Sequence, residues 1–326
     1  VFDELLSTEV IFLVGLDIMQ SHPVFGLKLK KAAENGVKLI NISPCDSLAD
    51  EWSVKTLRTD NINVLREILK SLIDSGKAPD ETRASGFNEL RESLAGVTVG
   101  TDAAEIASLY GSAKKAMIVF DQSHVTDDGA RLLADIAVVS GHIGKPRSGI
   151  IQLKPKANSQ GLSDLGAGNG PSRIIKGIAD GKIKGLFVFG EDPAGVDLDG
   201  LELLVVQDTH LTETARKADV VLPGAGFAES IGTFTNAERR IQKLNQAIPA
   251  LTGLNNCDII MMVSEFFTKE DNYCCAECVF EEIEEAVPEY RGIDPEDSAN
   301  SFWPARGNRV LYTDGFNTED KKAKLV

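Results

Sequence analysis

The chain has 326 residues, of which 43% are hydrophobic and 25% charged, proportions that are typical of soluble globular proteins. This length allows two domains with sizeable cores. The 34 basic residues are scattered among 49 acidic ones, and the formal charge is −15. A nucleic-acid-binding surface needs clustered cations, so no nucleic acid is expected as a partner. No stretch reaches the roughly 20 apolar residues of a membrane helix, so no membrane insertion is expected.

The cysteine content predicts a reducing compartment, and therefore a cytoplasmic location. Five cysteines are too few and too unevenly spaced for a disulfide framework. Cys274, Cys275 and Cys278 form the one cluster, and CxxC spacing suits half of a metal site. No second CxxC or His pair completes it, so the cluster is interpreted as the surface of a helix over Val279–Ala286 and no metal ligand is predicted. Because the chain opens on Val1 rather than Met, directly in a strand pattern, a fragment of a longer protein is expected.

In the first half, short apolar runs alternate with helical stretches, a pattern typical of βαβ units with mostly parallel strands. The expected strands are Val10–Val14, Val37–Ile42 and Ala116–Phe120. The expected helices are Phe25–Glu34, Asn61–Ser75, Ala103–Ala113 and Asp128–Ser140. The polar stretch 76–89 is interpreted as a surface loop. Residues 141–170, rich in Gly, Asn, Ser and Pro, are interpreted as the junction between two domains.

The strand-helix pattern resumes after that junction. The expected strands are Gly185–Phe189, Leu203–Val206 and Val220–Leu222, and no helix is expected from Arg291 onward. The predicted fold class is therefore α/β, with two Rossmann-like domains whose mostly parallel sheets are flanked by helices. No GxGxxG motif follows the first strand, which disfavours a nicotinamide-binding domain.

Similar polar residues recur where the predicted strands end. Ligands of open parallel sheets bind beyond the carboxyl ends of the strands. Glycine there admits close approach, carboxylates accept hydrogen bonds from ribose hydroxyls or a guanine edge, and Ser or Thr at a helix start can hold a phosphate. The segments are Gly15–Asp17, Ser21–Pro23, Ser43–Asp46, Gly190–Pro193, Gln207–Thr209 and Thr212–Ala215. Each one alone also fits ordinary turn and capping chemistry, and His22 fits either a phosphate contact or a turn before Pro23.

Taken in order, these segments resemble the molybdopterin oxidoreductase family, which includes formate dehydrogenases, nitrate reductases and the large iron–sulfur subunit of NADH-quinone oxidoreductase. The likeness covers nearly the whole chain. The segments that carry it are TEVIFLVGLDIMQSHP (8–23), GHIGKPRSGIIQLKPKANSQGLSDLG (141–166), GEDP (190–193), DTHLTETARKADVVLP (208–223) and ESIGTFTNAERRIQ (229–242).

The resemblance implies a fold of the formate dehydrogenase/DMSO reductase type (domains 1–3) and a bis-pterin guanine dinucleotide cofactor held between two domains. The implied domains are 1–153 and 154–290, with 291–326 as a linker towards a missing C-terminal domain. Residues implied to bind the first nucleotide are Gly15, Asp17, His22, Asp46 and Asp60. Residues implied for the second are Glu191, Asp192, Asp208, Thr212, Glu213, Gly232 and Asn236, with Asn158 and Gln160 nearer the pterin. The predicted groove is shared by the strand ends of both domains.

Two departures from the family pattern bear on function. The family's second strand usually ends in Asp-Pro-Arg, whereas this chain has Ser43-Pro44-Cys45. Formate dehydrogenases carry Arg in the run Arg-Gly-Gln-Asn-Asn-Val-Gln-Gly, where this chain has Lys154, which lacks the bidentate fork that suits a carboxylate. These departures favour the NADH-quinone oxidoreductase branch, in which the pterin site can be empty.

The main hypothesis is therefore an electron-transfer subunit like the large iron–sulfur subunit of NADH dehydrogenase. The alternatives are the catalytic subunit of a molybdenum or tungsten formate dehydrogenase and, in another class, a cofactor-free docking scaffold. An upstream cysteine-rich cluster segment and a downstream barrel-like domain are expected in the parent, together with other redox subunits as partners. No catalytic residue is assigned, and the fragment alone is expected to bind no metal or cofactor.

Overall fold

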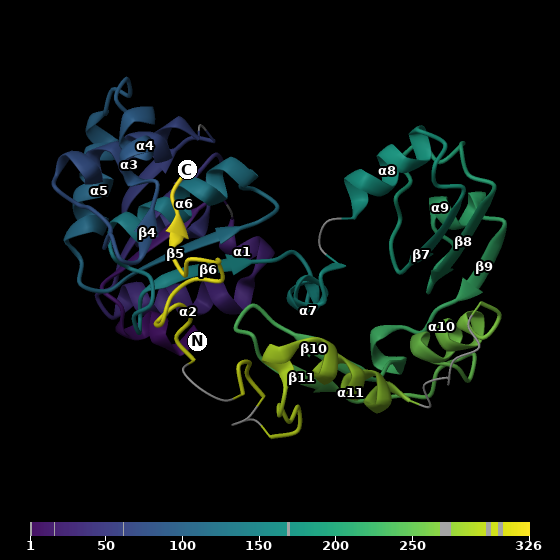
Figure 1. The fold of residues 1–326 in the computed structure, drawn as a ribbon. Coiled ribbons are helices and arrows are strands. Elements are labelled where there is room, and N and C mark those ends of the chain that lie inside the picture. Colours follow the sequence, from purple (N-terminus) through teal and green to yellow (C-terminus); the bar gives the residue numbers. More distant parts are fainter. Residues whose placement is uncertain are drawn as a thin grey trace. The chain divides into compact units, whose positions relative to one another are not determined.

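The computed structural model describes residues 2–15, 17–60, 62–167, 170–267, 275–297, 301–305 and 309–326. The chain divides into two compact units (Figure 1). Unit 1 comprises residues 1–156 and 308–326, and unit 2 comprises residues 157–307. The α/β class with mostly parallel sheets is confirmed. Among the described residues, no helix is both long and apolar enough to cross a membrane.

Unit 1 is built on a five-stranded parallel sheet with the order β3-β2-β1-β5-β6. Its strands are β1 (Val10–Val14), β2 (Lys38–Ser43), β3 (Ser53–Arg58), β5 (Ala116–Asp121) and β6 (Gly149–Leu153). All residues of β1 and β5 are buried, as expected for parallel strands that are covered on both faces. Phe12, Ile40 and Ile118 from three neighbouring strands enter one apolar core.

The helices of unit 1 follow the sequence signals closely. They are η1 (Phe2–Ser7), α1 (Ile18–Ser21), α2 (Pro23–Glu34), η2 (Leu48–Trp52), α3 (Asn63–Asp74), α4 (Phe87–Ser93), α5 (Thr101–Ser112) and α6 (Asp127–Val139). Leu65, Ile68, Leu69 and Leu72 give α3 an apolar stripe at helical spacing, and this stripe packs into the core. The predicted loop over 76–89 was wrong in part, because α4 begins within it at Phe87 and buries Leu90.

The last described segment of the chain returns to unit 1. Strand β12 (Ala323–Lys324) pairs in parallel with β4 (Ala84–Ser85), and Leu325 donates its N–H to the carbonyl of Ser85 at 2.9 Å. The prediction treated 291–326 as one linker, whereas the structure assigns 308–326 to unit 1 and the preceding residues to unit 2. The boundary between the units lies after Lys156, three residues beyond the end of β6 at Leu153, where the prediction placed it.

Unit 2 carries a smaller parallel sheet with the order β7-β8-β9, and a separate antiparallel hairpin. Its strands are β7 (Gly185–Phe189), β8 (Leu203–Asp208), β9 (Val220–Pro223), β10 (Gly232–Thr235) and β11 (Ile241–Leu244). Its helices are α7 (Ser159–Asp164), α8 (Pro171–Ala179), α9 (Glu213–Lys217), η4 (Phe227–Glu229), α10 (Asn256–Ser264), α11 (Ala276–Ala286) and η5 (Pro288–Tyr290). Val188, Leu204, Val206 and Ala215 form the core of its sheet.

Candidate functional site

The carboxyl ends of the unit 1 strands lie along one edge, because all five strands are parallel. The connection from β1 leads to β2 on one side, and the connection from the neighbouring strand β5 leads to β6 on the other side. The point between β1 and β5 is therefore the topological switch point where open α/β sheets bind ligands. Gly15 and Asp17 follow β1, Asp121 ends β5 and Lys154 follows β6. The structure thus collects the predicted residues of unit 1 along one edge of one sheet.

Gly15 and Asp17 shape the turn that leaves β1. Gly15 has a φ of +87°, and a Cβ there would lie 2.9 Å from the Val125 side chain, so a side chain at this position is excluded twice. The carboxylate of Asp17 accepts hydrogen bonds from the N–H groups of Met19 at 3.2 Å and Gln20 at 3.4 Å, which caps α1. Asp17 therefore has a structural task at this helix start.

His22 connects three parts of the edge. Its Nε2 lies 3.0 Å from the carbonyl oxygen of Lys154, and its Nδ1 lies 3.0 Å from Ser21 Oγ and 3.9 Å from Asp121 Oδ2. A carbonyl oxygen only accepts, so Nε2 carries the proton that this contact requires. His22 consequently holds the backbone at Lys154. The sequence left open whether His22 contacts a phosphate or a turn. Its observed partners are the adjacent Ser21 and, from distant segments, the Lys154 carbonyl and Asp121.

Asp121 and His124 are site residues that the sequence reasoning missed. The Asp121 side chain is buried, accepts the N–H of Ser123 at 2.7 Å, and lies 3.8 Å from His124 Nδ1. The sequence does contain a signal for Asp121, because the apolar run of β5 ends in this carboxylate, and carboxylates also follow other predicted strands. Together with His22, these residues form a titratable cluster at the switch point.

The turn after β2 recruits a cation from the neighbouring strand. Arg58, the last residue of β3, places its guanidinium 2.9 Å from Asp46 and 2.7 Å from Asp50, and NH1 also donates to the carbonyl of Cys45. Burial acts to raise the pKa of Asp50, but hydrogen bonds from the Ser47 N–H and from Arg58 hold it below its usual value. Arg58 of β3 thus places a guanidinium beside the Ser43-Pro44-Cys45 turn, where it forms ion pairs with Asp46 and Asp50.

Lys154 lies at the end of β6, within unit 1 rather than in the second domain as predicted. Its ammonium donates to Gln122 Oε1 at 3.4 Å, and the same oxygen accepts from Gln152 Nε2 at 3.1 Å. Gln122 follows Asp121 at the end of β5. The Lys154 ammonium is therefore held at the strand ends of unit 1 by the side-chain amide of Gln122.

In unit 2, Asp192 joins the segment after β7 to helix α9, whereas Thr212 and Asp208 accept local backbone hydrogen bonds. Asp192 accepts the hydroxyl of Thr214 at 2.6 Å and its N–H at 3.0 Å. The hydroxyl hydrogen bond, with the backbone one, holds the pKa of Asp192 below its ordinary value. Thr212 caps α9 by accepting the N–H of Ala215 at 3.2 Å. Asp208 also accepts a backbone hydrogen bond, from the N–H of His210 at 3.0 Å.

The remaining polar and glycine residues of the predicted segments in unit 2 fall into three kinds. Gly190 and Gly232 have positive φ values of 63° and 140°, and a Cβ at either would meet no atom within 4 Å, so the backbone lies open there. Glu191 and Glu213 are exposed. Asn236 instead organises the hairpin turn, because its Oδ1 accepts the N–H groups of Glu238 and Arg240.

Asn158 and Gln160 belong to a hydrogen-bonded cluster around α7. Asn158 accepts the N–H of Thr235 at 2.9 Å, and Gln160 donates to Asp164 at 2.7 Å. The other oxygen of Asp164 accepts from Tyr290 at 2.9 Å and from Trp303 at 3.0 Å. Burial raises the pKa of the Tyr290 phenol. This cluster fastens α7 to the hairpin within unit 2.

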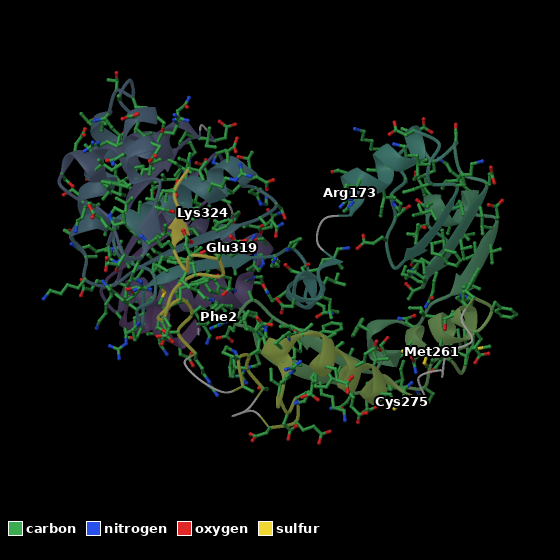
Figure 2. All side chains as sticks on the ribbon, viewed as in Figure 1. Phe2, Arg173, Met261, Cys275, Glu319 and Lys324 are labelled. Atoms are coloured by element: carbon green, nitrogen blue, oxygen red, sulfur yellow. The ribbon has the colours of Figure 1, made fainter. Side chains whose placement is uncertain are left out.

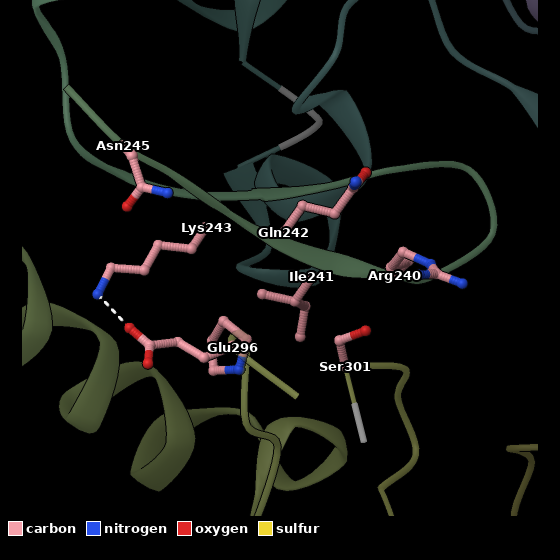
Figure 3. Close-up of a pocket in the computed structure, with 8 residues that line it drawn as sticks. Arg240, Ile241, Gln242, Lys243, Asn245, Glu296 and Ser301 are labelled. Carbon is pink, nitrogen blue, oxygen red and sulfur yellow. Dashed lines mark hydrogen bonds and ion pairs between the residues drawn. The ribbon is translucent and has the colours of Figure 1, made fainter. Parts of the chain in front are cut away.

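A cavity of about 400 Å³ lies beside the hairpin, away from the strand ends (Figure 3). Its wall includes Arg240, Gln242 and Lys243 on one side and Glu296 on the other, with Lys243 Nζ 2.6 Å from the Glu296 carboxylate. Charged groups across the cavity thus neutralise one another. None of the predicted nucleotide-binding residues lines it.

Metal ligands do not gather in the part of the chain that the structure describes. No group of three or more His, Cys, Asp or Glu side chains there could hold an ion. Cys274, one of the three clustered cysteines, lies outside the described residues. The predicted groove shared by the two units stays a prediction.

Comparison with known proteins identifies the family. The family model described as molybdopterin oxidoreductase matches residues 2–265. This chain belongs to the molybdopterin oxidoreductase family. Because the match spans most of both units, the resemblance predicted from the sequence is confirmed.

The relatives of this family member include formate dehydrogenase subunits. The alpha subunit of F420-dependent formate dehydrogenase 1 from Methanococcus maripaludis is 30% identical, over 96% of this chain and 57% of its own length. The corresponding alpha subunit from Methanocaldococcus jannaschii is 28% identical over 99% of this chain and 58% of its own. A putative formate dehydrogenase from Staphylococcus aureus is 28% identical over 99% of the chain and 40% of its own length. The chain thus spans between two fifths and three fifths of these relatives.

A solved structure supports the fold alone. Acetylene hydratase from Pelobacter acetylenicus matches with a TM-score of 0.66 at 15% identity, covering 98% of this chain and 55% of that one. The formate dehydrogenase relatives favour the alternative over the main sequence hypothesis, the NADH dehydrogenase branch, which these relatives do not support. For choosing a branch of the family, the departures at Ser43–Cys45 and Lys154 were a weaker guide than similarity along the whole chain.

The family implies a molybdenum or tungsten pterin, and the residues present fit a nucleotide-tailed one. Exposed carboxylates at Asp46 and Asp60 in unit 1 and Glu213 in unit 2 follow strand ends, where ribose hydroxyls and guanine N–H groups can donate to them. The open backbone at Gly190 and Gly232 admits close approach of a ligand.

Proposed function

We propose that this chain forms part of the catalytic alpha subunit of a formate dehydrogenase-type enzyme with a molybdenum or tungsten bis-pterin guanine dinucleotide. The supporting observation is the similarity to formate dehydrogenase alpha subunits, which are 30% and 28% identical to this chain over 96% and 99% of its length. Because the chain spans just over half of those subunits, oxidation of formate belongs to the complete subunit and its partner redox subunits. The share of this chain is to bind the nucleotides and to position the carboxylate.

In this proposal, the nucleotide tails are held by residues at the strand ends. Asp46 and Asp60 accept hydrogen bonds from one guanosine, and Asp208 and Glu213 accept them from the other. Asp46 is already 2.9 Å from Arg58, so the pair presents an acceptor and a donor side by side. Such a pair can contact both a ribose hydroxyl and a phosphate oxygen. The second acceptor site lies in unit 2, with Gly190 as its open floor.

Lys154 supplies the charge that attracts formate. When bound, the metal–pterin group supplies the two-electron redox chemistry. The ammonium of Lys154 attracts the carboxylate as a point charge, whereas the arginine that is usual in formate dehydrogenases offers a fork. His22 Nε2–H holds the Lys154 carbonyl at 3.0 Å, so the lysine leaves the sheet in a fixed direction. Gln122 steers its ammonium.

A scaffold function without cofactor is the second candidate, and one observation favours it. Asp17, Asp192, Thr212 and Asn236, all predicted to bind nucleotide, already accept hydrogen bonds from the chain's own backbone. Residues with satisfied acceptors have less to offer a ligand. The two candidates make opposite predictions about guanine nucleotide in the purified subunit.

The test uses the complete subunit, purified with its partners from its own organism. Acid denaturation releases bound nucleotide and pterin, which are measured by chromatography and fluorescence, and elemental analysis measures molybdenum and tungsten. The enzyme proposal expects all three together with formate-dependent dye reduction. In Asp60→Ala and Asp208→Ala, guanine nucleotide content falls, whereas Asp74→Ala at the end of α3 leaves it unchanged. A folded subunit without pterin or guanine nucleotide contradicts the enzyme proposal and supports the scaffold.

A further inference from the structure

Two thiols at the start of α11 lie close together. Cys275 is the residue before the helix and Cys278 lies in its first turn, and their sulfur atoms are 3.3 Å apart. The backbone of Cys275 is extended, and its sulfur lies beside that of Cys278 at the start of the helix. Both side chains are partly exposed. Figure 2 labels Cys275 on unit 2.

The geometry suits a disulfide better than a metal site. A disulfide joins sulfur atoms at about 2 Å, so closure requires them to approach by about 1.3 Å, which small rotations about the Cα–Cβ bonds supply. A structural zinc site needs four ligands. Among the described residues, no third His, Cys, Asp or Glu side chain joins the pair in a possible metal site.

We infer that Cys275 and Cys278 are a redox-active dithiol. Its co-reactant is a disulfide of the glutathione class. One thiolate attacks a sulfur of that disulfide and expels a thiolate, giving a mixed disulfide. The second cysteine thiolate then attacks the sulfur of the first and expels the other thiolate. Two electrons and two protons pass from the dithiol to the co-reactant, which leaves as two thiols.

The pair borders a cavity that its oxidation would affect. A cavity of about 300 Å³ is lined by Ala276, Glu277 and Phe280 of α11. Glu277 also lies 3.6 Å from the ammonium of Lys243 in the hairpin. A disulfide between Cys275 and Cys278 fixes the first turn of α11, and therefore the wall of this cavity and the position of Glu277. The inference is independent of the proposed oxidation of formate.

The experiment equilibrates the full 326-residue chain with mixtures of reduced and oxidised glutathione. Remaining thiols are then blocked with N-ethylmaleimide in acid. Mass spectrometry with peptide fragmentation follows the tryptic peptide 270–291, which contains Cys274 as well as the pair. We expect this peptide to carry one N-ethylmaleimide and two fewer hydrogen atoms in the peptide itself as the oxidised fraction rises, with the bond assigned to Cys275 and Cys278. When reduced glutathione is in excess, we expect it to carry three N-ethylmaleimide groups and no internal bond.

Single variants give the matched controls. In Cys275→Ser and Cys278→Ser, the internal disulfide is lost and the remaining cysteine of the pair gains one glutathione instead. In Cys257→Ser, on α10, the internal disulfide forms as in the parent chain. The inference is overturned if the parent peptide never loses two hydrogens, or if fragmentation assigns the bond to Cys274. Both results come from the unmutated chain, so they do not depend on the folding of a variant.

Discussion

The two units use the same strand–helix motif with different amounts of buried apolar surface. In unit 1, every residue of β1 and β5 is buried. In unit 2, β7 and β9 leave most of their residues partly or fully exposed, including Phe189 at 46% and Val220 at 43%. Apolar burial is the main favourable contribution to folding, so the larger core makes unit 1 the more stable of the two. The difference teaches that a shared topology does not imply equal stability.

The largest expected effect compares one leucine in each core. Leu69→Ala in α3 removes a fully buried side chain from the large core of unit 1, and we expect a loss of about 4 kcal/mol in its free energy of unfolding. Leu204→Ala in β8 removes a leucine from a core of four buried residues, and we expect about 2 kcal/mol. Urea unfolding of the full chain, with hydrogen exchange followed separately in each unit, measures the loss of unfolding free energy in both variants. Equal losses would contradict the comparison.

The units also differ in how a carboxyl group responds to pH. Burial raises the pKa of Asp135 in unit 1 from 3.8 to about 7, so its folded form holds a proton that the unfolded chain releases. Unit 1 therefore loses stability as pH rises from about 4 towards 7, by an amount on the order of a few kcal/mol. Asp192 in unit 2 has a lowered pKa, so it contributes stability above the unfolded value and loses it as pH falls.

Asparagine variants separate these opposite dependences of stability on pH. Asp135→Asn removes the loss at rising pH from unit 1, and Asp192→Asn removes the loss at falling pH from unit 2. Thermal unfolding between pH 4 and pH 7 measures the slope of unit 1, and thermal unfolding below about pH 4 measures the slope of unit 2. If Asp135→Asn leaves the pH dependence of unit 1 unchanged, then Asp135 is not the group responsible.

The next largest expected effect is on KM for formate, and it tests the positive charge that Lys154 of unit 1 contributes to the proposed reaction. In the complete subunit, Lys154→Ala should raise KM for formate by about 10-fold to 100-fold, because a hydrogen bond to a charged group contributes about 1.5 to 3 kcal/mol. Lys154→Arg should retain most of the affinity. Lys156→Ala, two residues further along the same loop and exposed, is the matched control. Steady-state kinetics gives the values, and an unchanged KM in Lys154→Ala removes the lysine from the proposal.

The smallest effect compares two helix caps. Thr126 caps α6 in unit 1 through the N–H of Gly129, and Thr212 caps α9 in unit 2 through that of Ala215. We expect Thr126→Ala and Thr212→Ala each to cost about 1 kcal/mol of stability. If Thr212 also binds a phosphate, its variant lowers the guanine nucleotide content of the complete subunit as well, and the Thr126 variant does not. Chemical denaturation and nucleotide analysis distinguish the two tasks.

Much of the fold could be predicted because its signals are local. The run Gly185–Phe189 was predicted with the bounds of β7, and the helices of unit 1 that were predicted agree with the structure to within two residues. Strand β3 was missed because its residues are half-buried at the edge of the sheet, which weakens the apolar pattern. Strand β6 was missed because glycine-rich sequence surrounds it.

The site could be predicted only in part, because its contacts join distant segments. The carboxylates at strand ends are visible in sequence, since they close apolar runs. The partner of Asp46 is Arg58 on the next strand, and the partner of His22 is the Lys154 backbone, 132 residues away. No local pattern encodes such pairs. For that reason, the sequence indicated that the Ser43-Pro44-Cys45 turn lacks an arginine, although Arg58 of β3 lies next to it in the fold.

The return of the last segment to unit 1 has a consequence for synthesis. Ser85 and Ala323, which are hydrogen-bonded neighbours, are 238 residues apart in sequence, and the whole of unit 2 is translated between them. At the usual pace of translation, residues 157–307 take roughly 8 to 30 s to emerge from the ribosome. During that interval the nascent chain exposes the edge of β4 without β12. Unit 2 can therefore fold before unit 1 is complete.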